Sequence, residues 1–309
     1  LYLVSFSNYW VLAIVLSVLS FLATWFFYQE LKRLSLPKWT IQFALFFIPS
    51  VVFWTSGLMK ETVSFAVINL IFGIILRIKR NVPYQSLHFF LFGVLNVMLF
   101  YLKYYLFAPV FVLSLLFFVI HFTNQKARKL WLFLSLLGIV LIVTTAISFL
   151  HPNMNYDFFL EALFNNYQKT ISCTSSPALI AIDYDGTFYS FLLAIPQALF
   201  IGLFRPSVFE IWNTLSLFLA IENLVIFVLF LSSVYGLIKN RLLKNQTLVI
   251  LAMLFVVFLA VILPIASPNY GSLVRYRTAY YPLFVLLILQ NVKLQQVKKR
   301  FTSRVKHEK

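Results

Sequence analysis

Long runs of apolar residues without a formal charge constrain this chain more than any other feature. Residues 86–102, 130–150 and 247–266 contain no Asp, Glu, Lys or Arg. The hydrocarbon core of a bilayer is about 30 Å thick, which a helix of about 20 apolar residues can cross. In that core every backbone N–H and C=O group needs an internal partner, and a helix supplies one for nearly all of them. The runs therefore predict an all-α protein whose helices span a membrane several times.

The composition supports the same class of protein. Of the 309 residues, 61% are hydrophobic and 11% are charged, whereas soluble domains have about 25% charged residues. A soluble monomer is therefore excluded, and we expect a single integral membrane domain over residues 1–309. The lone cysteine, Cys173, excludes an internal disulfide. The chain starts at Leu1 rather than Met, so we expect an N-terminally truncated fragment.

The net charge of +16 is concentrated in short basic bursts between the apolar runs. The bursts are Lys32, Arg33 and Lys38; Arg77, Lys79 and Arg80; Lys126, Arg128 and Lys129; Lys239, Arg241 and Lys244; and a basic tail over residues 293–309. Basic bursts at the ends of spans are typical of cytoplasmic loops. This charge therefore indicates topology and contact with anionic membrane lipids, and not binding of nucleic acid.

Placing every basic burst in the cytoplasm predicts about nine spans. They cover residues 8–28, 40–56, 62–77, 86–102, 106–122, 130–150, 214–238, 246–266 and 278–294. The stretch over residues 87–122 must form two helices with a turn at residues 103–105, because one helix of that length would be about 54 Å long. The large loop over residues 151–213 is then extracytoplasmic, and the tail over residues 293–309 is cytoplasmic.

The large loop contains two further elements. Residues 187–204 are apolar and long enough to span, but a span here would divide the basic residues almost evenly between the two sides. We therefore expect a re-entrant or interfacial segment that is broken at Pro196. Residues 157–169 carry a polar side chain at every fourth position, which predicts an amphipathic helix on the membrane surface.

Six basic residues fall on the outer side of this topology, and five of them, all except Lys169, lie at the membrane boundary against the general bias. These five are Lys60, Lys103, Arg205, Arg275 and Arg277. Basic side chains at span ends often only extend to the interface, and that interpretation stays open for each of them. In SPNYGSLVRYR, however, two arginines follow a Pro-Gly turn, and in an extended segment positions two apart point the same way. Because arginine donates paired hydrogen bonds to phosphate, we expect these cations to bind an anionic lipid headgroup.

Three acidic residues on the same side are candidates for chemistry. Glu61 lies at the start of a span, next to one of the outer cations. Asp183 belongs to DYDG, a turn that suits a divalent cation or a general base, or is simply a solvated acidic turn. Glu222 lies inside a span and needs a partner such as Arg205 or Arg275, unless it only supports helix packing. The histidines show no metal-ligand spacing, so we assign no metal site and no cofactor beyond that possible divalent cation.

Three segments together resemble a group of bacterial polytopic enzymes of surface-polysaccharide assembly. The segments are FIPSVVFWTSGLMKE, GLFRPSVFEIWN followed by IEN, and SPNYGSLVRYRTAYYP. The group comprises O-antigen-polymerase-like proteins and GT-C-type glycosyltransferases, and the resemblance covers about residues 49–282. It implies transfer or polymerisation of sugars on the outer face of the bacterial inner membrane, from a polyprenyl-phosphate-linked donor to a glycan or lipid acceptor.

The resemblance also implies roles for particular residues. Arg275, Arg277, Arg205 and Lys60 would hold the phosphate of the donor, and their position adds Lys103 and Glu222 as substrate-binding candidates. GT-C enzymes carry a catalytic acid in the first outer loop, which we expect to lie upstream of this fragment. Glu61 and Asp183 therefore stand in as the catalytic candidates. A flippase for lipid-linked glycans and a non-catalytic membrane scaffold remain the alternatives.

Overall fold

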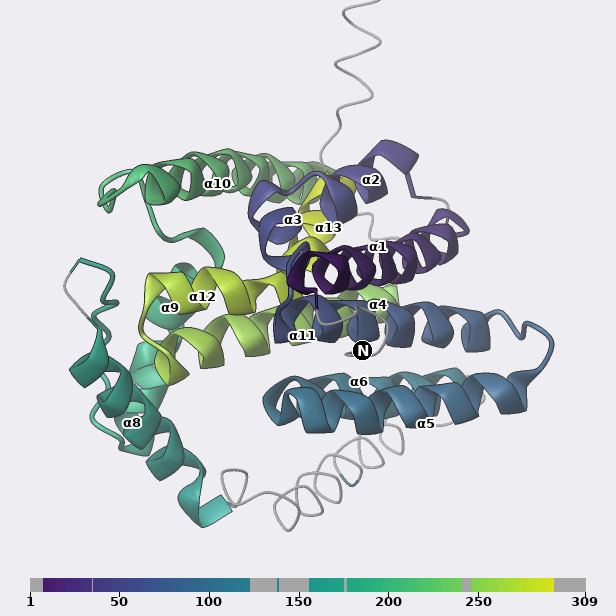
Figure 1. Cartoon of the computed structure of the whole chain (residues 1–309), viewed down its shortest axis with the longest axis horizontal. Coiled ribbons are helices and arrows are strands. Elements are labelled where there is room, and N and C mark those ends of the chain that lie inside the picture. Colours follow the sequence, from purple (N-terminus) through teal and green to yellow (C-terminus); the bar gives the residue numbers. More distant parts are fainter. Residues whose placement is uncertain are drawn as a thin grey trace, which may run out of the picture.

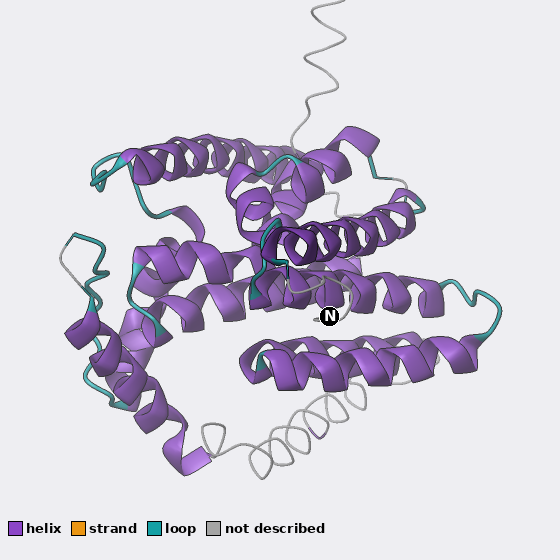
Figure 2. Ribbon diagram, in the orientation of Figure 1, coloured by secondary structure: helices purple, strands orange, loops and turns teal. Residues whose placement is uncertain are grey.

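The computed structural model describes residues 8–34, 36–122, 138, 156–174, 177–240 and 246–291, which form helices joined by short turns (Figure 1 and Figure 2). Within these ranges the only β-type pairing is a single bridge between Leu179 and Asn269. The all-α class expected from the apolar runs is confirmed for the described residues.

The helices keep the labels of Figure 1. They are α1 (Tyr9–Lys32), α2 (Lys38–Phe46), α3 (Pro49–Thr55), α4 (Lys60–Lys79), α5 (Gln85–Leu102), α6 (Tyr104–Phe122), α8 (Tyr156–Cys173), α9 (Phe188–Phe204), α10 (Thr214–Asn240), α11 (Gln246–Ala266), α12 (Tyr270–Tyr276), the 3-10 turn η2 (Arg277–Ala279) and α13 (Tyr281–Asn291).

Six helices in the described part of the chain are long and apolar enough to cross a membrane. They are α1, α4, α5, α6, α10 and α11. Each corresponds to one of the expected spans, at residues 8–28, 62–77, 86–102, 106–122, 214–238 and 246–266. Length and composition therefore indicate an integral membrane protein.

The expected span over residues 40–56 is interrupted. α2 ends at Phe46, and α3 begins at Pro49 after Ile48 has adopted an extended conformation. Proline lacks an N–H group and its ring clashes with the preceding turn, so a helix stops before it and restarts with proline in its first position. The expected span at residues 278–294 is represented by η2 and α13, and the one at residues 130–150 lies outside the described residues except for position 138.

Two contacts show that α1 and α4 run parallel to each other. Asn69 donates to the Thr24 hydroxyl at 2.9 Å, and farther along both helices Arg77 Nε lies 3.0 Å from Glu30 Oε1. α5 and α6 meet at Lys103, where the sequence predicted a turn. At one end of the bundle α4 begins, α5 meets α6, and α12 is found. We call this end the α12 end. It is the left-hand end in Figure 1, where α8 and α9 also lie.

The amphipathic helix expected within residues 157–169 is confirmed as α8. Leu163 and Tyr167 are buried on one side, whereas Glu161, Asn165 and Lys169 are exposed. The buried side is held by the Tyr167 hydroxyl, which donates to a backbone carbonyl of the segment that leads to α9.

The apolar segment at residues 187–204 forms one helix, α9, and the break expected at Pro196 is wrong. The helix continues through Pro196 because neighbouring helices and small local adjustments can compensate the missing hydrogen bond of a proline. α9 packs directly on α11 at Gly202, where an added Cβ would stand 2.1 Å from the carbonyl oxygen of Ala260. This close crossing fixes α9 against the bundle.

Candidate functional site

Three charged side chains from distant parts of the sequence meet at the α12 end. Lys103 Nζ lies 2.8 Å from Glu61 Oε1, and Arg275 Nε lies 3.2 Å from the same oxygen. The first contact is a hydrogen bond, whereas the second is an ion pair without hydrogen-bond geometry. We call Glu61, Lys103 and Arg275 the charge triad. It joins α4, the α5–α6 turn and α12.

Each member of the triad stands at a helix end that suits its charge. Glu61 lies in the first turn of α4, where the partial positive charge of the helix N-terminus stabilises a carboxylate. Lys103 caps the C-terminus of α5 and Arg275 lies in the last turn of α12, where the partial negative charge stabilises cations. The three helix ends therefore converge with charges that favour both the helices and the triad.

The core of the triad is buried among tyrosine rings. The side chains of Glu61 and Lys103 are 6% and 7% exposed. Lys103 Nζ lies 4.9 Å from the ring centroid of Tyr276 and 5.8 Å from that of Tyr105. Burial lowers the pKa of Lys103, and the ion pair with Glu61 opposes that shift. The carboxylate therefore supports the charged form of a lysine that water barely reaches.

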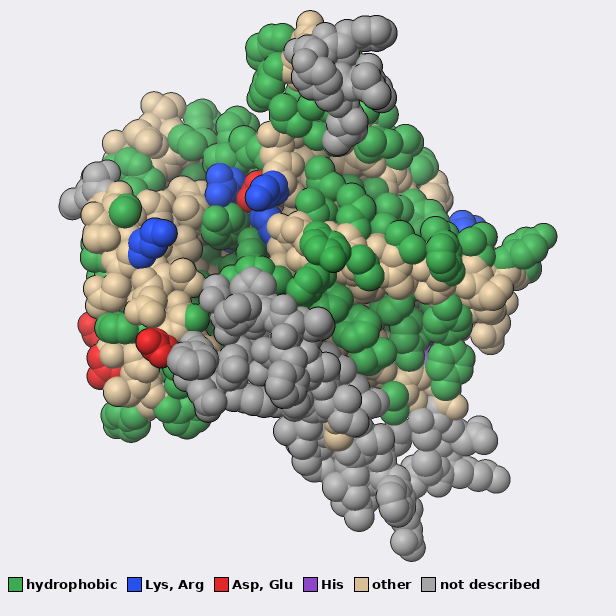
Figure 3. Space-filling model, turned by 60° about the horizontal axis from the view of Figure 1, so that its bottom comes forward, with side chains coloured by type: hydrophobic (Ala, Val, Ile, Leu, Met, Phe, Trp, Pro, Cys, Tyr) green, Lys and Arg blue, Asp and Glu red, His purple; other side chains and the backbone are tan. Residues whose placement is uncertain are grey.

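The exposed side of the triad keeps unused binding capacity. The Arg275 side chain is 37% exposed. Of its five N–H donors, one on Nη2 donates to the Tyr276 hydroxyl at 3.1 Å, and the others donate to no acceptor among the described residues. Lys60 is exposed and forms no ion pair with any described residue. Basic side chains gather around an acidic one beside a hollow on the face in Figure 3. Together with Lys60, the triad sets three cations against one anion and therefore suits an anionic ligand.

Arg275 and Arg277 face different surroundings, which corrects the expectation of an extended segment. Asn269 caps α12 by accepting from the Ser272 N–H, and the chain is helical from there to residue 279. Positions two apart on a helix diverge by about 200°. Arg275 therefore joins the triad, whereas Arg277 turns into the protein and is only 1% exposed.

Arg277 lies against the C-terminal end of α9. Its Nη1 donates to the Arg205 carbonyl at 3.2 Å, and its guanidinium lies 4.2 Å from the ring centroid of Tyr281. The Tyr280 hydroxyl donates to the Gly202 carbonyl of the same helix end at 2.7 Å. The partial negative charge of a helix C-terminus favours a cation there. Nε and Nη2 of Arg277 have no hydrogen-bond partner among the described residues.

Arg205 is occupied by an ion pair within its own loop. Its Nε lies 2.9 Å from Glu210 Oε2, and its Nη2 bonds Oε1. Glu210 also accepts from the backbone N–H and the hydroxyl of Ser207 and from the Tyr270 hydroxyl. The pair fixes the loop between α9 and α10 beside α12, and it leaves Arg205 little capacity for a ligand.

Glu222 does not pair with Arg205 or Arg275, so the partner predicted for it is wrong. It accepts from the Ser50 backbone N–H at 2.8 Å and from the Ser50 hydroxyl at 2.5 Å. These bonds join α10 to the first turn of α3. Ser50 at the start of α3 thus satisfies the hydrogen bonding of the Glu222 carboxylate. The two residues are 172 positions apart, so no local sequence pattern connects them.

The two aspartates of DYDG differ in their hydrogen-bond partners. Asp183 is exposed, and no ion pair joins it to the triad or to another described residue. Asp185 accepts from Thr187 at 2.9 and 2.7 Å and from the Ser190 hydroxyl, at the start of α9. These hydrogen bonds lower the pKa of Asp185 to about 2. No group of three or more potential metal ligands occurs in the described ranges.

Sequence reasoning missed Tyr105, Tyr276 and Glu210. Tyr105 and Tyr276 lie within two positions of a triad cation. A tyrosine close in sequence to a lone cation at the end of a span was therefore the signal that could have identified them. Glu210 is five positions after Arg205 in a Pro-containing loop. Because a loop has no helical or strand period, this spacing did not predict that the two side chains would pair.

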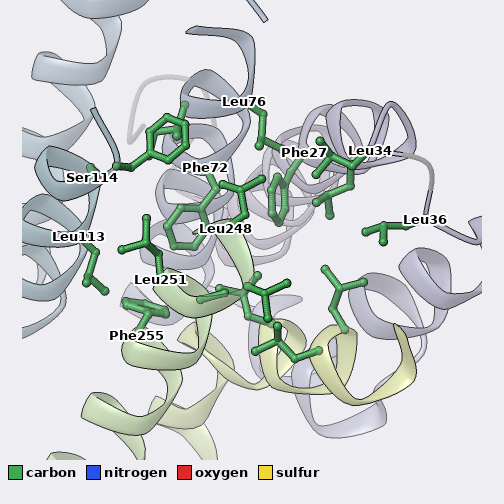
Figure 4. A pocket seen from close by; sticks show the side chains of 18 of the residues that line it. Phe27, Leu34, Leu36, Phe72, Leu76, Leu113, Ser114, Leu248, Leu251 and Phe255 are labelled. Carbon is green, nitrogen blue, oxygen red and sulfur yellow. The ribbon is translucent and has the colours of Figure 1, made fainter. Parts of the chain in front are cut away.

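An apolar cavity of about 130 Å³ lies between α1, α4, α6, α11 and α13 (Figure 4). Its wall carries Phe27, Phe72 and Phe255, and among the described lining residues only Ser114 and Gln290 are polar. Phe72 lies 11 positions beyond Glu61 on α4, about 16 Å along the helix axis. The cavity is thus remote from the triad and suits an apolar chain.

Comparison of this chain with protein-family models, with curated proteins and with solved structures finds no match.

Proposed function

We propose that the protein transfers or polymerises sugars from a polyprenyl-phosphate-linked donor, and that the charge triad binds the phosphate of that donor. The carrying observation is the meeting of Glu61, Lys103 and Arg275 at one end of the bundle, beside the exposed Lys60. A net positive cluster next to lipid fits a ligand that is anionic and membrane-bound. The apolar cavities between the helices fit the lipid part of such a ligand.

The distribution of charge supports an orientation for this site. The described residues of three basic bursts lie at or next to helix ends opposite the α12 end; they are Lys32, Arg33, Lys38, Arg77, Lys79, Arg80 and Lys239. The positive-inside rule then puts the α12 end on the extracytoplasmic face of a bacterial inner membrane. In this proposal the nine-span topology is retained, with α9 as an interfacial helix and α2–α3 as one interrupted span.

The triad suggests how the reaction is catalysed. The acceptor hydroxyl attacks the anomeric carbon, the bond from that carbon to the phosphate oxygen breaks, and the phosphate leaves with the electron pair. Arg275 and Lys60 donate to the phosphate oxygens as negative charge develops on them. Glu61 orients Lys103 and Arg275 through Oε1 and takes the acceptor proton on Oε2, the oxygen that forms neither ion pair. Arg205, Arg277, Glu222 and Asp183 are left outside this step.

The test is sugar transfer by the purified protein in lipid nanodiscs. A panel of synthetic polyprenyl-phosphate and polyprenyl-pyrophosphate sugars with a radiolabelled sugar is the donor, and labelled glycan or glycolipid is the readout. We expect Arg275→Ala to lower the transfer rate about 10²-fold, because it removes a donor to the leaving group. Lys169→Ala is the matched control, since it removes an exposed cation of α8 outside the triad.

Two results would overturn the proposal. One is a transfer rate for Arg275→Ala equal to that of the wild type. The other is an absence of transfer from every donor in the panel while fluorescent lipid-linked sugars cross the membrane of reconstituted vesicles, which would identify a flippase.

A further inference from the structure

A second groove, between α1 and the α2–α3 pair, is unusually polar for a membrane-facing surface. It has a volume of about 460 Å³. Its polar lining residues are Ser17, Ser20, Thr24, Gln42, Thr55 and Ser56. The cavity of Figure 4, by contrast, has two polar lining residues among twenty. Polar side chains within membrane helices are expensive unless they have a partner, so hydrogen-bonding capacity that the protein leaves unused on one groove indicates a ligand.

Most of these hydroxyl groups donate to the backbone and present acceptors to the groove. The Ser17 hydroxyl is 2.7 Å from the carbonyl oxygens of both Ala13 and Ser56. Thr24 and Thr55 donate to carbonyls four positions earlier, at 2.8 and 2.7 Å. A hydroxyl has one donor and two acceptor lone pairs, so each retains acceptor capacity. The complementary ligand carries several O–H or N–H donors.

Ser20 is the strongest single indication. It is only 4% exposed and lines the groove, and its hydroxyl has no hydrogen-bond partner among the described residues. Its hydroxyl oxygen is not fully enclosed by protein atoms, which leaves it accessible from the groove. A ligand hydroxyl in the groove would complete its hydrogen bonding.

Aromatic rings complete the lining. Trp25 and Phe21 come from α1, and Phe46, Phe47 and Phe65 from the facing segments. Trp25 and Phe21 stack at 6.1 Å between ring centroids, and Phe46 packs against both of them. A sugar ring offers apolar C–H faces and a rim of O–H donors, which matches aromatic faces alternating with hydroxyl acceptors.

The groove is continuous with the turn that precedes the triad. Ser56 lines the groove and begins the turn over residues 56–59, which leads directly to Lys60. The turn is fixed on one side by the Ser17–Ser56 bond and on the other by the Thr62 hydroxyl, which donates to the Gly57 carbonyl at 2.6 Å. A head group at the Ser56 end of the groove therefore lies next to the cations that would hold the donor.

We propose that this groove binds the hydroxyl-rich head of a membrane glycolipid, and that it is the acceptor subsite. The role as acceptor subsite rests on the proposed function, whereas the affinity for a hydroxyl-rich head does not. The groove between α3 and α10 lacks this pattern, because Ser50 and Glu222 are the only polar residues in the described part of its lining and they bind each other.

The test is photo-crosslinking of the full chain in phosphatidylcholine nanodiscs, where no turnover is required. The probe is an alkyl glucoside with a diazirine in its chain, and the comparison probe has the same chain on a phosphocholine head. We expect the glucoside to label peptides from residues 13–28 and 42–56. Ser20→Ala should weaken this labelling about twofold to tenfold, because one net hydrogen bond is lost. Ser20→Ala loses no protein hydrogen bond, so the fold is unaffected.

Controls separate this proposal from the proposed function. Ser114→Ala removes a buried hydroxyl from another membrane helix, where it donates to Val110, and should leave the labelling unchanged. Arg275→Ala should also keep the labelling, even if it abolishes sugar transfer. Equal labelling by both probes, labelling insensitive to Ser20→Ala, or labelling elsewhere in the chain would each overturn the proposal of a glycolipid groove.

Discussion

The two ends of α4 carry clusters of the same composition, one carboxylate with two cations, but they use it differently. At the far end, Glu30 of α1 pairs with Arg77 of α4 and with Arg80, the residue that directly follows α4, and each carboxylate oxygen takes one arginine. At the α12 end, one oxygen of Glu61 takes both Lys103 and Arg275. The first carboxylate is thus used on both oxygens, whereas the second has an oxygen outside both ion pairs.

The origin of the cations differs as well. Arg77 and Arg80 lie at the C-terminal end of one helix that already packs on α1, and Arg77 lies 4.7 Å from the ring centroid of Phe26. The triad instead gathers cations from two separate segments and has the exposed Lys60 beside it. A cluster that only joins two neighbouring helices needs none of this. The clearest difference is therefore the second carboxylate oxygen, which takes an arginine at the far end and lies outside both ion pairs at the α12 end.

Glu61→Gln should produce the largest effect, and it tests whether the cluster at the α12 end is needed for sugar transfer. We expect sugar transfer to fall about 10²-fold or more, because the proton acceptor and the anchor of Arg275 are lost together. The rate of transfer in nanodiscs at saturating donor is the measurement.

Because Glu61→Gln also leaves Lys103 without its carboxylate, stability must be separated from activity. Glu61→Gln with Lys103→Met removes both charges, and replacing a buried pair in this way is often neutral for stability. We expect a near-normal unfolding midpoint and no recovery of transfer. Recovery of transfer in this double variant would mean that the triad is only a structural ion pair.

Glu30→Gln should produce the opposite pattern. Two arginines would lose their counterion, which we expect to cost about 2–3 kcal/mol, less than for a fully buried pair because both arginines are partly exposed. The free energy of unfolding in mixed micelles measures this. The rate of transfer well below the unfolding temperature should stay unchanged, and a parallel loss of transfer would mean that the two ends are not functionally distinct.

The sequence was most informative where membrane physics acts on each helix separately. Six apolar runs became membrane-length helices, and the turn at Lys103 follows from the length of a helix relative to a bilayer. The amphipathic period of α8 was equally local. The interruption at Pro49 and the continuity through Pro196 show the limit, because a proline ends or merely perturbs a helix according to what packs around it.

The composition of the site was only partly predictable for a related reason. The sequence identified Lys60, Glu61, Lys103 and Arg275 as exceptional charges, but nothing local joins Glu61 to a residue 214 positions later. The separation of Arg275 from Arg277 depended on whether the segment after Pro268 is extended or helical, and the Asn269 cap decided it. In the folded chain Glu222 is hydrogen-bonded to Ser50, and Arg205 is paired with Glu210. Neither pairing follows from the sequence.

Asp185 extends the comparison to a third carboxylate and should give the smallest effect. It lies in the loop before α9, is exposed, and binds only hydroxyl and backbone N–H groups. Its pKa is lowered to about 2, so the stabilising effect of its charge is fully present above the ordinary carboxyl pKa of about 3.9. That effect should disappear as the pH falls toward 2.

The measurement is the unfolding midpoint of the wild type minus that of Asp185→Asn, between pH 2 and pH 7. We expect a small positive difference that is constant above about pH 5 and vanishes near pH 2, with no change in the rate of transfer. A difference that grows on acidification would contradict the hydrogen-bonded cap. A loss of transfer would instead bring the DYDG turn back as a catalytic element, and the triad would then not be the complete site.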